Sequence, residues 1–384
     1  MKRLFPLPTL LFAAFLVAPC PGGNTPQYAV ALPGYHYSFP RDNFNHPAYQ
    51  TEWWYYTGNL WTSKGRRFGF ELTFFRVGVS RAPRPASVWN VNDVYMAHVA
   101  LSDIQSQKFY DDQRLNRAGP GVAGIDDSSG KIWNGNWQVV WRGDAQELRA
   151  VTTEFAFGLV LHSLKAPVIQ GINGVSRKAP GRGHASHYIS LTRLAAQGTV
   201  RLSGHSYPVK GSAWMDHEFF TEQLSGSPSG WDWTCMQFDA NTELMVYRLR
   251  RQDGSEDPYS SGTYVDAEGH SQHLTVKDFQ MQPGSIWTSP ETHARYPVNW
   301  RVQVPSLGIS IVVTTPLKSQ ELVSKNQFTP TYWEGAIDLS GTKAGKSIHG
   351  VGYLELTGYA RSARLPAHDS AVPGSHRRWP IMVA

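Results

Sequence analysis

One stretch of the sequence combines side chains capable of acid–base chemistry with the pattern of a buried strand. Residues 211–220 read Gly-Ser-Ala-Trp-Met-Asp-His-Glu-Phe-Phe. Successive side chains of a strand point to opposite faces, so Trp214, Asp216 and Glu218 share one face and His217 lies on the other. Burial beside aromatic rings raises the pKa of a carboxyl group towards neutrality, where the group can donate a proton. Asp216 is therefore our first candidate for a catalytic acid.

Other interpretations of these residues compete with catalysis. A buried carboxyl group such as Asp216 can instead cap backbone amides or pair with an arginine, and ion-pair networks also perturb acids. A metal site made of Asp216, His217 and Glu218 is not expected, because adjacent strand residues point to opposite faces and no His-x-x-x-His or cysteine motif adds ligands. The sequence also has no Gly-x-Ser-x-Gly elbow and no glycine-rich phosphate loop. A nucleophilic serine hydrolase is therefore not indicated.

The elements that position this stretch are expected to be strands. The 384-residue chain is 12% aromatic and contains 35 glycines and 25 prolines, a composition that favours many strands and turns over long helices. Its length exceeds that of one typical core and predicts two domains. Alternating apolar residues recur in short segments bounded by turns, as in residues 68–77 after the Ser63-Lys64-Gly65 turn. The predicted fold class is all-β.

An internal similarity suggests that the two domains resemble each other. Residues 56–60 followed by 69–73 share a pattern with residues 333–337 followed by 352–357: aromatic-x-Gly-x-aliphatic, a turn, then Gly-aromatic and Leu-Thr. Both segments are also ordinary hairpin sequences. The similarity favours two antiparallel barrels. We expect Asp216 to lie in the wall of the first barrel, with its carboxyl group inside.

The first 31 residues have the pattern of an export signal. Lys2 and Arg3 precede an apolar run over residues 10–18, which is too short to span a bilayer permanently. Cleavage after Ala31 and lipid attachment at Cys20 are both open. The predicted organisation is a leader over residues 1–31, barrels over 32–222 and 223–360, and a polar, disordered tail over 361–384. The predicted location is the periplasm or cell envelope.

Charge and cysteine content exclude further classes. The formal net charge of +6 is modest for this length, and the basic residues are scattered, so nucleic-acid binding is not expected. The chain has two cysteines. If Cys20 is removed or lipidated, Cys235 has no disulfide partner, and its apolar strand predicts a buried, inert thiol.

Several motifs together are specific enough to indicate a family. They are Glu-Trp-Trp-Tyr-Tyr-Thr-Gly at 52–58 and the segments 186–194, 211–220, 230–233, 243–245, 332–335 and 352–359. These motifs resemble the family of AttH and carotenoid 1,2-hydratase, over about residues 35–359. The resemblance implies two consecutive lipocalin-like antiparallel β-barrels, an exported protein, and a pocket for an elongated apolar molecule such as an isoprenoid or a lipid.

The resemblance also implies roles for particular residues. The hydratase branch has an Asp as acid, a Tyr two residues before it, a His about thirty residues upstream and a Trp two residues after that His. Asp216 and His187 match this pattern, whereas Trp214 replaces the Tyr and Ile189 replaces the Trp. The Trp-Met-Asp-His-Glu sequence is more similar to the AttH branch, whose members accompany transport components. The candidate catalytic residues are Asp216, His187 and Trp214. The candidate substrate-binding residues are Glu218, Trp54, Tyr56, Tyr188, Trp231 and Trp233.

The chemistry expected of such a site is the addition of water to a C=C bond, without metal or organic cofactor. Asp216 would donate the proton, Trp214 would stabilise the carbocation by about 1–2 kcal/mol, and His187 or Glu218 would orient the water. Two alternatives remain open: a non-catalytic carrier or accessory protein of an envelope ABC transporter, and a lipocalin-like cyclase. Barrel packing is the competing interpretation of the tryptophans. A cavity faced by both Asp216 and His187 would favour catalysis.

Overall fold

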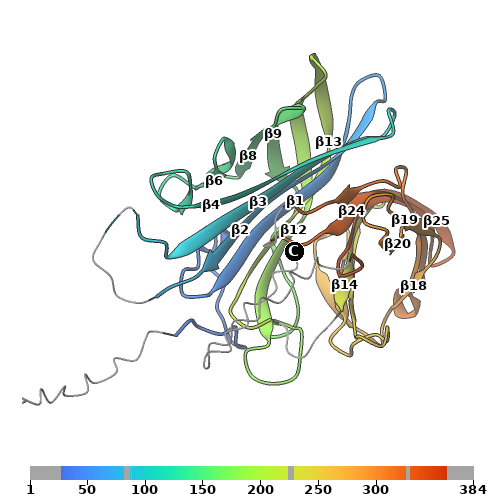
Figure 1. Cartoon of the computed structure of the whole chain (residues 1–384). Coiled ribbons are helices and arrows are strands. Elements are labelled where there is room, and N and C mark those ends of the chain that lie inside the picture. The colour runs from blue at the N-terminus through green and yellow to red at the C-terminus, as the bar shows by residue number, and fades with distance from the viewer. Residues whose placement is uncertain (1–26, 82–86, 88, 224–228, 326–328, 361–384) are drawn as a thin grey trace, which may run out of the picture.

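The structure is a computed structural model that describes residues 27–81, 87, 89–223, 229–325 and 329–360, and in these ranges the chain is almost entirely β-structure (Figure 1). Two single-turn 3-10 helices, η1 (Arg41–Asn43) and η2 (Pro305–Leu307), interrupt the strands. Within the described ranges, no helix has the length and apolar character needed to cross a membrane. Cys20, most of the predicted leader and the predicted tail lie outside the described residues.

The first sheet curls into a barrel-like body. Its strands follow the order β4-β3-β2-β1-β13-β12-β9-β8-β7-β6-β5, and the short β10 and β11 add to β12. The bounds are β1 Thr51–Trp61, β2 Arg67–Gly78, β3 Asp93–Asp103, β4 Lys108–Arg117, β5 Ala123–Asp126, β6 Lys131–Asn134, β7 Trp137–Arg142, β8 Ala145–Val151, β9 Phe155–Ser163, β10 Val168–Ile169, β11 Ser176–Arg177, β12 Ala185–Leu202 and β13 His205–Phe220. All pairings along this path are antiparallel, as the alternating sequence pattern predicts.

The second sheet repeats the arrangement with fewer strands, in the order β17-β16-β15-β14-β25-β24-β22-β21-β18. The bounds are β14 Gly230–Phe238, β15 Glu243–Arg250, β16 Ser261–Val265, β17 Ser271–Thr275, β18 Gln280–Pro283, β21 Trp300–Val304, β22 Ile309–Thr314, β24 Tyr332–Lys343 and β25 Lys346–Leu356. The short β23 (Glu321–Leu322) pairs with β24, and β19 (Ile286–Thr288) pairs with β20 (Arg295–Pro297). The prediction of two antiparallel barrel-like units is confirmed.

The internal similarity that suggested two barrels is not a structural repeat. In each sheet the first strand pairs with the last, β1 with β13 and β14 with β25. Residues 56–60 and 69–73 lie on β1 and β2, the first two strands of their sheet. Residues 333–337 and 352–357 lie on β24 and β25 and the residue after it, at the end of theirs. The shared pattern therefore reflects hairpin sequence preferences at two inequivalent positions.

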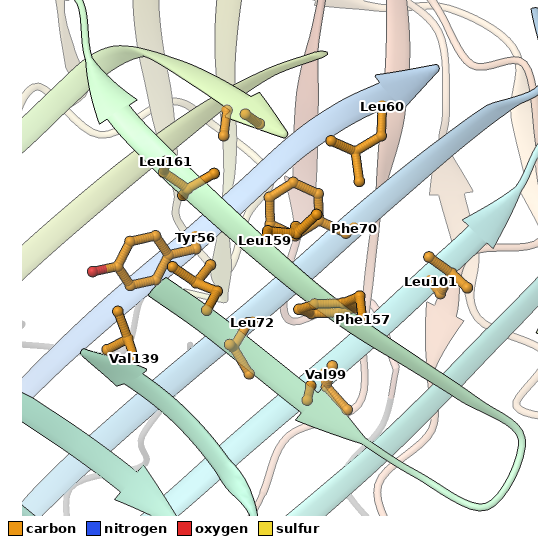
Figure 2. Packing of buried hydrophobic residues seen from close by; sticks show 14 of the residues in the cluster. Tyr56, Leu60, Phe70, Leu72, Val99, Leu101, Val139, Phe157, Leu159 and Leu161 are labelled. Carbon is orange, nitrogen blue, oxygen red and sulfur yellow. The ribbon is translucent and has the colours of Figure 1, made fainter. Parts of the chain in front are cut away.

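The first barrel is filled by apolar side chains (Figure 2). Alternate residues of β1, β2, β3, β7 and β9 point into it, including Tyr56, Leu60, Phe70, Leu72, Val99, Leu101, Val139, Phe157, Leu159 and Leu161. Each has at most 2% of its surface exposed. The interior of this barrel is thus a packed core, and the functional face must be sought elsewhere.

Both faces of β13 are buried, which decides where Asp216 lies. Ala213 and Met215 belong to the core of the first barrel. Trp214 belongs to a separate cluster with Tyr188 of β12 and Trp233 of the second barrel. The side of β13 that carries Asp216 therefore faces the second barrel, and the expectation that Asp216 points into the first barrel is wrong. The alternation was correctly anticipated, but a second sheet covers the outer face and makes both faces apolar.

Polar contacts hold the two barrels together around this face. Arg67 of β2 pairs with Asp338 of β24 at 2.5 Å. Arg193 of β12 and Lys165 both pair with Glu243 of β15, at 2.5 and 2.7 Å. Because these bonds join the first sheet to the second on several strands, the interface between the barrels is a fixed part of the fold.

Candidate active site

Two rows of side chains, one from each sheet, face each other across the interface. The first row crosses β12, β13, β1 and β2 at paired positions, and its members are Ser190, Asp216, Tyr55 and Thr73. The second row crosses β14, β25 and β24, and its members are Trp233, Glu355 and Glu334. The Tyr55 hydroxyl donates a hydrogen bond to Glu334 and so connects the rows. Strand register thus brings together residues nearly 300 positions apart in the sequence.

A cavity of about 660 Å3, a volume that includes the solvent at its mouth, lies between these rows. Its sixteen lining residues are Trp53, Tyr55, Thr73, Phe75, Lys178, Tyr188, Asp216, Glu218, Gln223, Trp231, Trp233, Tyr247, Leu249, Tyr332, Glu334 and Glu355. Eight are aromatic, four are acids, one is a lysine and one is aliphatic. Both barrels contribute, so the site exists only in the two-barrel protein.

Asp216 is held at the cavity wall by three hydrogen-bond donors. The hydroxyl of Tyr188 donates to Oδ2 at 2.5 Å, the hydroxyl of Ser190 donates to Oδ1 at 2.5 Å, and the indole N–H of Trp214 donates to Oδ1 at 2.7 Å. Only 4% of the Asp216 surface is exposed. The carboxyl group therefore has a fixed orientation and little contact with bulk water.

A second layer of donors, partly from the second barrel, orients the first. The indole N–H of Trp233 donates to the Tyr188 hydroxyl at 3.1 Å. The side-chain amide of Gln170 donates to the Ser190 hydroxyl at 2.9 Å, and Thr263 of β16 donates to the Gln170 carbonyl at 2.5 Å. Each hydroxyl that donates to Asp216 thus accepts a hydrogen bond itself, which polarises it towards the carboxyl group.

Burial makes Asp216 an acid that titrates near neutral pH. Loss of solvent raises its pKa from 3.8 to about 7, although the bonds from Ser190, Tyr188 and Trp214 oppose the rise, and the charge of Glu218 adds to it. At neutral pH a large fraction of Asp216 carries a proton. Such a group can deliver a proton to a bound molecule.

Glu218 lies two residues further along the same face and has its own partners. The Ser186 hydroxyl and the Gln223 amide donate to Oε2, the latter at 3.0 Å, and the ammonium group of Lys178 lies 4.0 Å away. Burial raises the pKa of Glu218. Burial opposes the charge of Lys178, but the oxygens of Tyr247 and Glu218 outweigh it and raise the pKa of that ammonium group. Lys178 and Glu218 form a buried ion pair at one end of the cavity.

Two further acids line the cavity from the second barrel, and a third, Glu71 of β2 in the first barrel, lies near them. Glu334 and Glu355 are direct neighbours on β24 and β25, with 1% and 7% of their surfaces exposed. Glu355 accepts a hydrogen bond from the indole N–H of Trp231 at 3.1 Å. Burial, followed by the charges of neighbouring acids, raises the pKa of both far above the usual range, and burial raises that of Glu71 to about 7. Burial therefore favours the protonated form of all three acids.

Three predicted site residues lie away from the cavity. His187 is on the opposite face of β12 from Tyr188; its Nδ1 lies 2.9 Å from the Gly174 carbonyl oxygen, and its ring packs on Phe219. Burial lowers the pKa of His187 to about 4. Trp54 and Tyr56 belong to the core of the first barrel. The hypothesis that His187 and Asp216 share one cavity is wrong, because residues an odd number apart in register point to opposite faces.

The structure brings the other candidates together. Tyr188, Glu218, Trp231 and Trp233 line the same cavity as Asp216, and Trp214 contacts Asp216 from behind. The sequence analysis missed Trp53, Tyr55, Lys178, Glu334 and Glu355. A signal for the two glutamates was present: each is the one acid in a short apolar segment, Tyr-Trp-Glu-Gly-Ala-Ile at 332–337 and Tyr-Leu-Glu-Leu at 353–356. Trp53 and Tyr55 are identified only by the register of β1 with β13, in which Tyr55 is the direct partner of Asp216.

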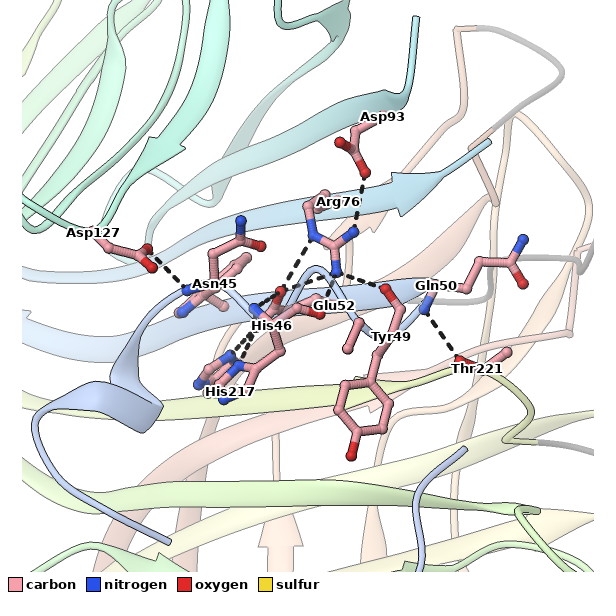
Figure 3. Close-up of polar contacts among 12 residues, drawn as sticks. Asn45, His46, Tyr49, Gln50, Glu52, Arg76, Asp93, Asp127, His217 and Thr221 are labelled. Atoms are coloured by element: carbon pink, nitrogen blue, oxygen red, sulfur yellow. Dashed lines mark hydrogen bonds and ion pairs between the residues drawn. The ribbon is translucent and has the colours of Figure 1, made fainter. Parts of the chain in front are cut away.

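A separate buried cluster in the first barrel joins His46, Glu52, His217 and Arg76 (Figure 3). Asp42 adds to it through His46 Nε2, which lies 3.1 Å from Oδ1 of Asp42. Glu52 Oε1 lies 2.7 Å from His46 Nδ1 and 2.8 Å from His217 Nε2, and Arg76 holds Oε2 at 3.2 Å. Burial would raise the pKa of Glu52, but its bonds to His217 and His46 lower it well below the usual range.

Within the described residues, the buried groups whose spacing could suit a metal ion are His46, Glu52 and His217. Two ligands of a tetrahedral zinc ion lie about 3.3 Å apart, given bonds of about 2.0–2.1 Å, whereas these atoms lie at hydrogen-bond distance. The cluster is therefore a closed hydrogen-bond and ion-pair network that fixes β1, β2 and β13. The expectation that the protein needs no metal or cofactor stays a prediction.

Comparison with known proteins identifies the family. The model of the AttH-like family matches residues 30–359, most of the chain. The chain belongs to the AttH-like family. The resemblance inferred from the motifs is thereby confirmed. Among curated proteins, none matches the chain.

Solved structures extend the comparison of this AttH-like protein. A structure assigned to AttH from Nitrosomonas europaea is 34% identical, with a TM-score of 0.77, covering 86% of this chain and 100% of that one. Kievitone hydratase from Nectria haematococca has a TM-score of 0.65 at 14% identity, covering 87% and 96%. CghA in complex with Sch210972 has a TM-score of 0.53 at 14% identity, covering 88% and 96%. At these lower identities the likeness shows the fold alone, which is the predicted pair of lipocalin-like barrels.

Proposed function

We propose that this AttH-like protein binds a molecule with an apolar body in the cavity between its barrels and that Asp216 protonates a C=C bond of that molecule, to which water then adds. The observation that carries the proposal is Asp216 itself, a buried acid with a pKa of about 7, oriented by three donors at the wall of a mainly aromatic cavity. Kievitone hydratase, named as a hydratase, shares the fold.

In the proposed reaction, Asp216 transfers its proton to one alkene carbon, and the second carbon becomes a carbocation. A water oxygen attacks that carbon, and the proton released from the water returns to the Asp216 carboxylate. The result is an alcohol, and the acid is regenerated without a cofactor. Glu218 is the group available to orient the water, because it lines the cavity and His187 does not. Trp214 holds Asp216 in place, and the rings of Trp231 and Trp233 line the cavity.

The cavity volume limits the substrate. The volume of about 660 Å3 includes open solvent at the mouth, so the enclosed part of the cavity is smaller. An elongated isoprenoid or lipid would place only one end beside Asp216. The proposed substrates are thus molecules with a reactive terminal double bond, whose remaining length extends towards solvent.

The test is turnover of terminal isoprenoid alkenes in water enriched in 18O, with the product analysed by mass spectrometry. The wild type should yield an alcohol that carries one 18O atom, and Asp216→Asn should lose this activity about a hundredfold or more. Asp144→Asn, at an exposed residue, is the matched control and should retain activity. Unchanged turnover by a folded Asp216→Asn protein would remove Asp216 from the mechanism.

A second candidate function is a non-catalytic lipid carrier or an accessory protein of an envelope ABC transporter. The observation that favours it is the set of three donors that hold the Asp216 oxygens, which would equally suit a structural carboxyl group. A lipocalin-like cyclase, the third interpretation of the sequence, is the remaining alternative. Native mass spectrometry of protein purified from its own cell envelope would favour the carrier if an unmodified lipid is retained. Export from the cytoplasm stays a prediction.

A further inference from the structure

We propose that the cavity between the barrels binds positive charge, so that its preferred ligand is an apolar molecule with a cationic ammonium group that lies beside Glu334 and Glu355. The inference rests on the proposed function in one respect, that the same cavity is the ligand site. It goes further by naming the charge of the group that binds.

The lining is unusual for a purely apolar ligand. Eight of the sixteen lining residues are aromatic, and the only aliphatic one is Leu249. A site that selects apolar molecules by shape alone can use aliphatic and aromatic residues alike. The faces of aromatic rings carry partial negative charge and attract cations, most strongly in a site shielded from water. The composition of the wall therefore favours a positive group over a neutral one.

The acids in the wall are not balanced by bases. Four of the lining residues are acids and one, Lys178, is a base. Lys178 already lies 4.0 Å from Glu218 and over the ring of Tyr247 at 3.9 Å. In the described chain, none of the ion pairs includes Asp216, Glu334 or Glu355. A buried acid can ionise only if its charge is paired. A cationic ligand would give Glu334 and Glu355 such a partner.

The aromatic rings are held where such a ligand would need them. Trp231 donates its indole N–H to Glu355, so the ring stands beside the acid pair of Glu334 and Glu355. Tyr55 donates to Glu334 and packs against Trp233 with ring centroids 5.4 Å apart at 86°. These contacts fix two acids and three rings before any ligand binds, which lowers the entropic cost of binding.

The arrangement predicts that binding of a cationic ligand is coupled to the release of protons from the buried acids. Burial and the charges of neighbouring acids raise the pKa values of Glu334 and Glu355 well above the usual range. A bound cation stabilises the carboxylate form and lowers those pKa values. Binding should therefore release protons, and the affinity should rise with pH.

The experiment compares three ten-carbon probes by isothermal titration calorimetry: decyltrimethylammonium, decan-1-ol and decanoate. Decyltrimethylammonium should bind at least tenfold more tightly than decan-1-ol, which corresponds to about 1.4 kcal/mol, and decanoate should bind most weakly. Repeating the titration in buffers of different ionisation enthalpy should reveal proton release for the ammonium probe alone. Equal or tighter binding of decan-1-ol would overturn the inference.

A substitution at Glu355 tests the role of the acid pair Glu334 and Glu355 independently of the rest of the cavity. Glu355→Gln should reduce the preference for decyltrimethylammonium about fivefold or more and leave decan-1-ol binding unchanged, whereas Glu154→Gln, at an exposed residue, should change neither. A preference that survives in folded Glu355→Gln contradicts the role of the acid pair. If this variant fails to fold, the wild-type preference and its rise with pH decide the question. If decan-1-ol binds and decyltrimethylammonium binds no more tightly, this inference is wrong and the proposed function is unaffected. If none of the three probes binds, the result counts against both.

Discussion

The raised pKa of Asp216 predicts a specific pH dependence of folding stability. In the unfolded chain Asp216 should titrate near 3.8, and in the folded protein near 7. Below pH 3.8 the group is protonated in both states and stability is unaffected. As pH rises from 3.8 to 7, only the unfolded state loses the proton, so folding becomes less favourable. Above pH 7 the penalty is complete, and the pKa difference corresponds to about 4 kcal/mol.

Asp216→Asn removes this titration and keeps the shape of the side chain. At pH 4 the variant should be less stable than the wild type by about 1 kcal/mol, because one of the three donors to the carboxyl group then faces the amide N–H2. At pH 8 the order should reverse, and the variant should be more stable by about 3 kcal/mol. Urea unfolding at pH 4, 5, 6, 7 and 8, followed by tryptophan fluorescence, measures both proteins.

The difference in pH-dependent stability between wild type and Asp216→Asn separates the titration of Asp216 from that of other buried acids. Glu71, whose pKa burial raises to about 7, titrates in both proteins and cancels. Parallel pH profiles of wild type and Asp216→Asn would refute the argument, since they would mean that Asp216 has the same proton affinity in the folded and unfolded states. That result would also remove the basis for a neutral acid at the cavity wall.

Three further predictions test the placement of residues. Trp231→Ala should weaken binding of a cavity ligand about tenfold, or about 1.4 kcal/mol, whereas Trp54→Phe should leave affinity unchanged because Trp54 packs in the barrel core; titration calorimetry distinguishes them. Glu52→Gln should destabilise the protein by about 3–5 kcal/mol, because it leaves the buried charges around it unpaired; urea unfolding measures this. Gly211→Ala should cost about 3 kcal/mol, since a Cβ there would lie 1.9 Å from the Asn59 carbonyl oxygen; a thermal shift checks it, and an unaltered melting temperature would contradict the close approach of β13 to β1.

The sequence predicts the fold class well because each prediction uses local information. Aromatic alternation, glycine and proline turns, and the family motifs indicate antiparallel strands in two barrels, and the sheets have this form. It predicts less well which face of a strand is functional. On β13 both Met215 and Trp214 are almost fully buried, at 1% and 2% exposure. An apolar face packed on a second sheet has the same composition as one that lines a barrel.

The predicted site residues that lie away from the cavity, His187, Trp54 and Tyr56, follow from this ambiguity. Trp53, Trp54, Tyr55 and Tyr56 are four consecutive aromatic residues, and either alternate pair could have faced a ligand. The pair that faces Asp216 is determined by the register of β1 with β13, in which Tyr55 is the partner of Asp216. Register between strands 160 residues apart is set by the turns and packing of the whole sheet. No local pattern contains it.

The involvement of the second barrel explains why Asp216 is a special acid and not simply a buried one. Its two hydroxyl donors sit on β12 of the first barrel, but the groups that orient those hydroxyls include Trp233 of β14 and, through Gln170, Thr263 of β16. The side chains that shield Asp216 from water also include Trp233 and Tyr247. A single barrel would leave this face of β13 open to solvent, and the pKa of Asp216 would fall towards its usual value. Two barrels are thus the smallest arrangement that gives this chain both a cavity and a neutral acid in its wall.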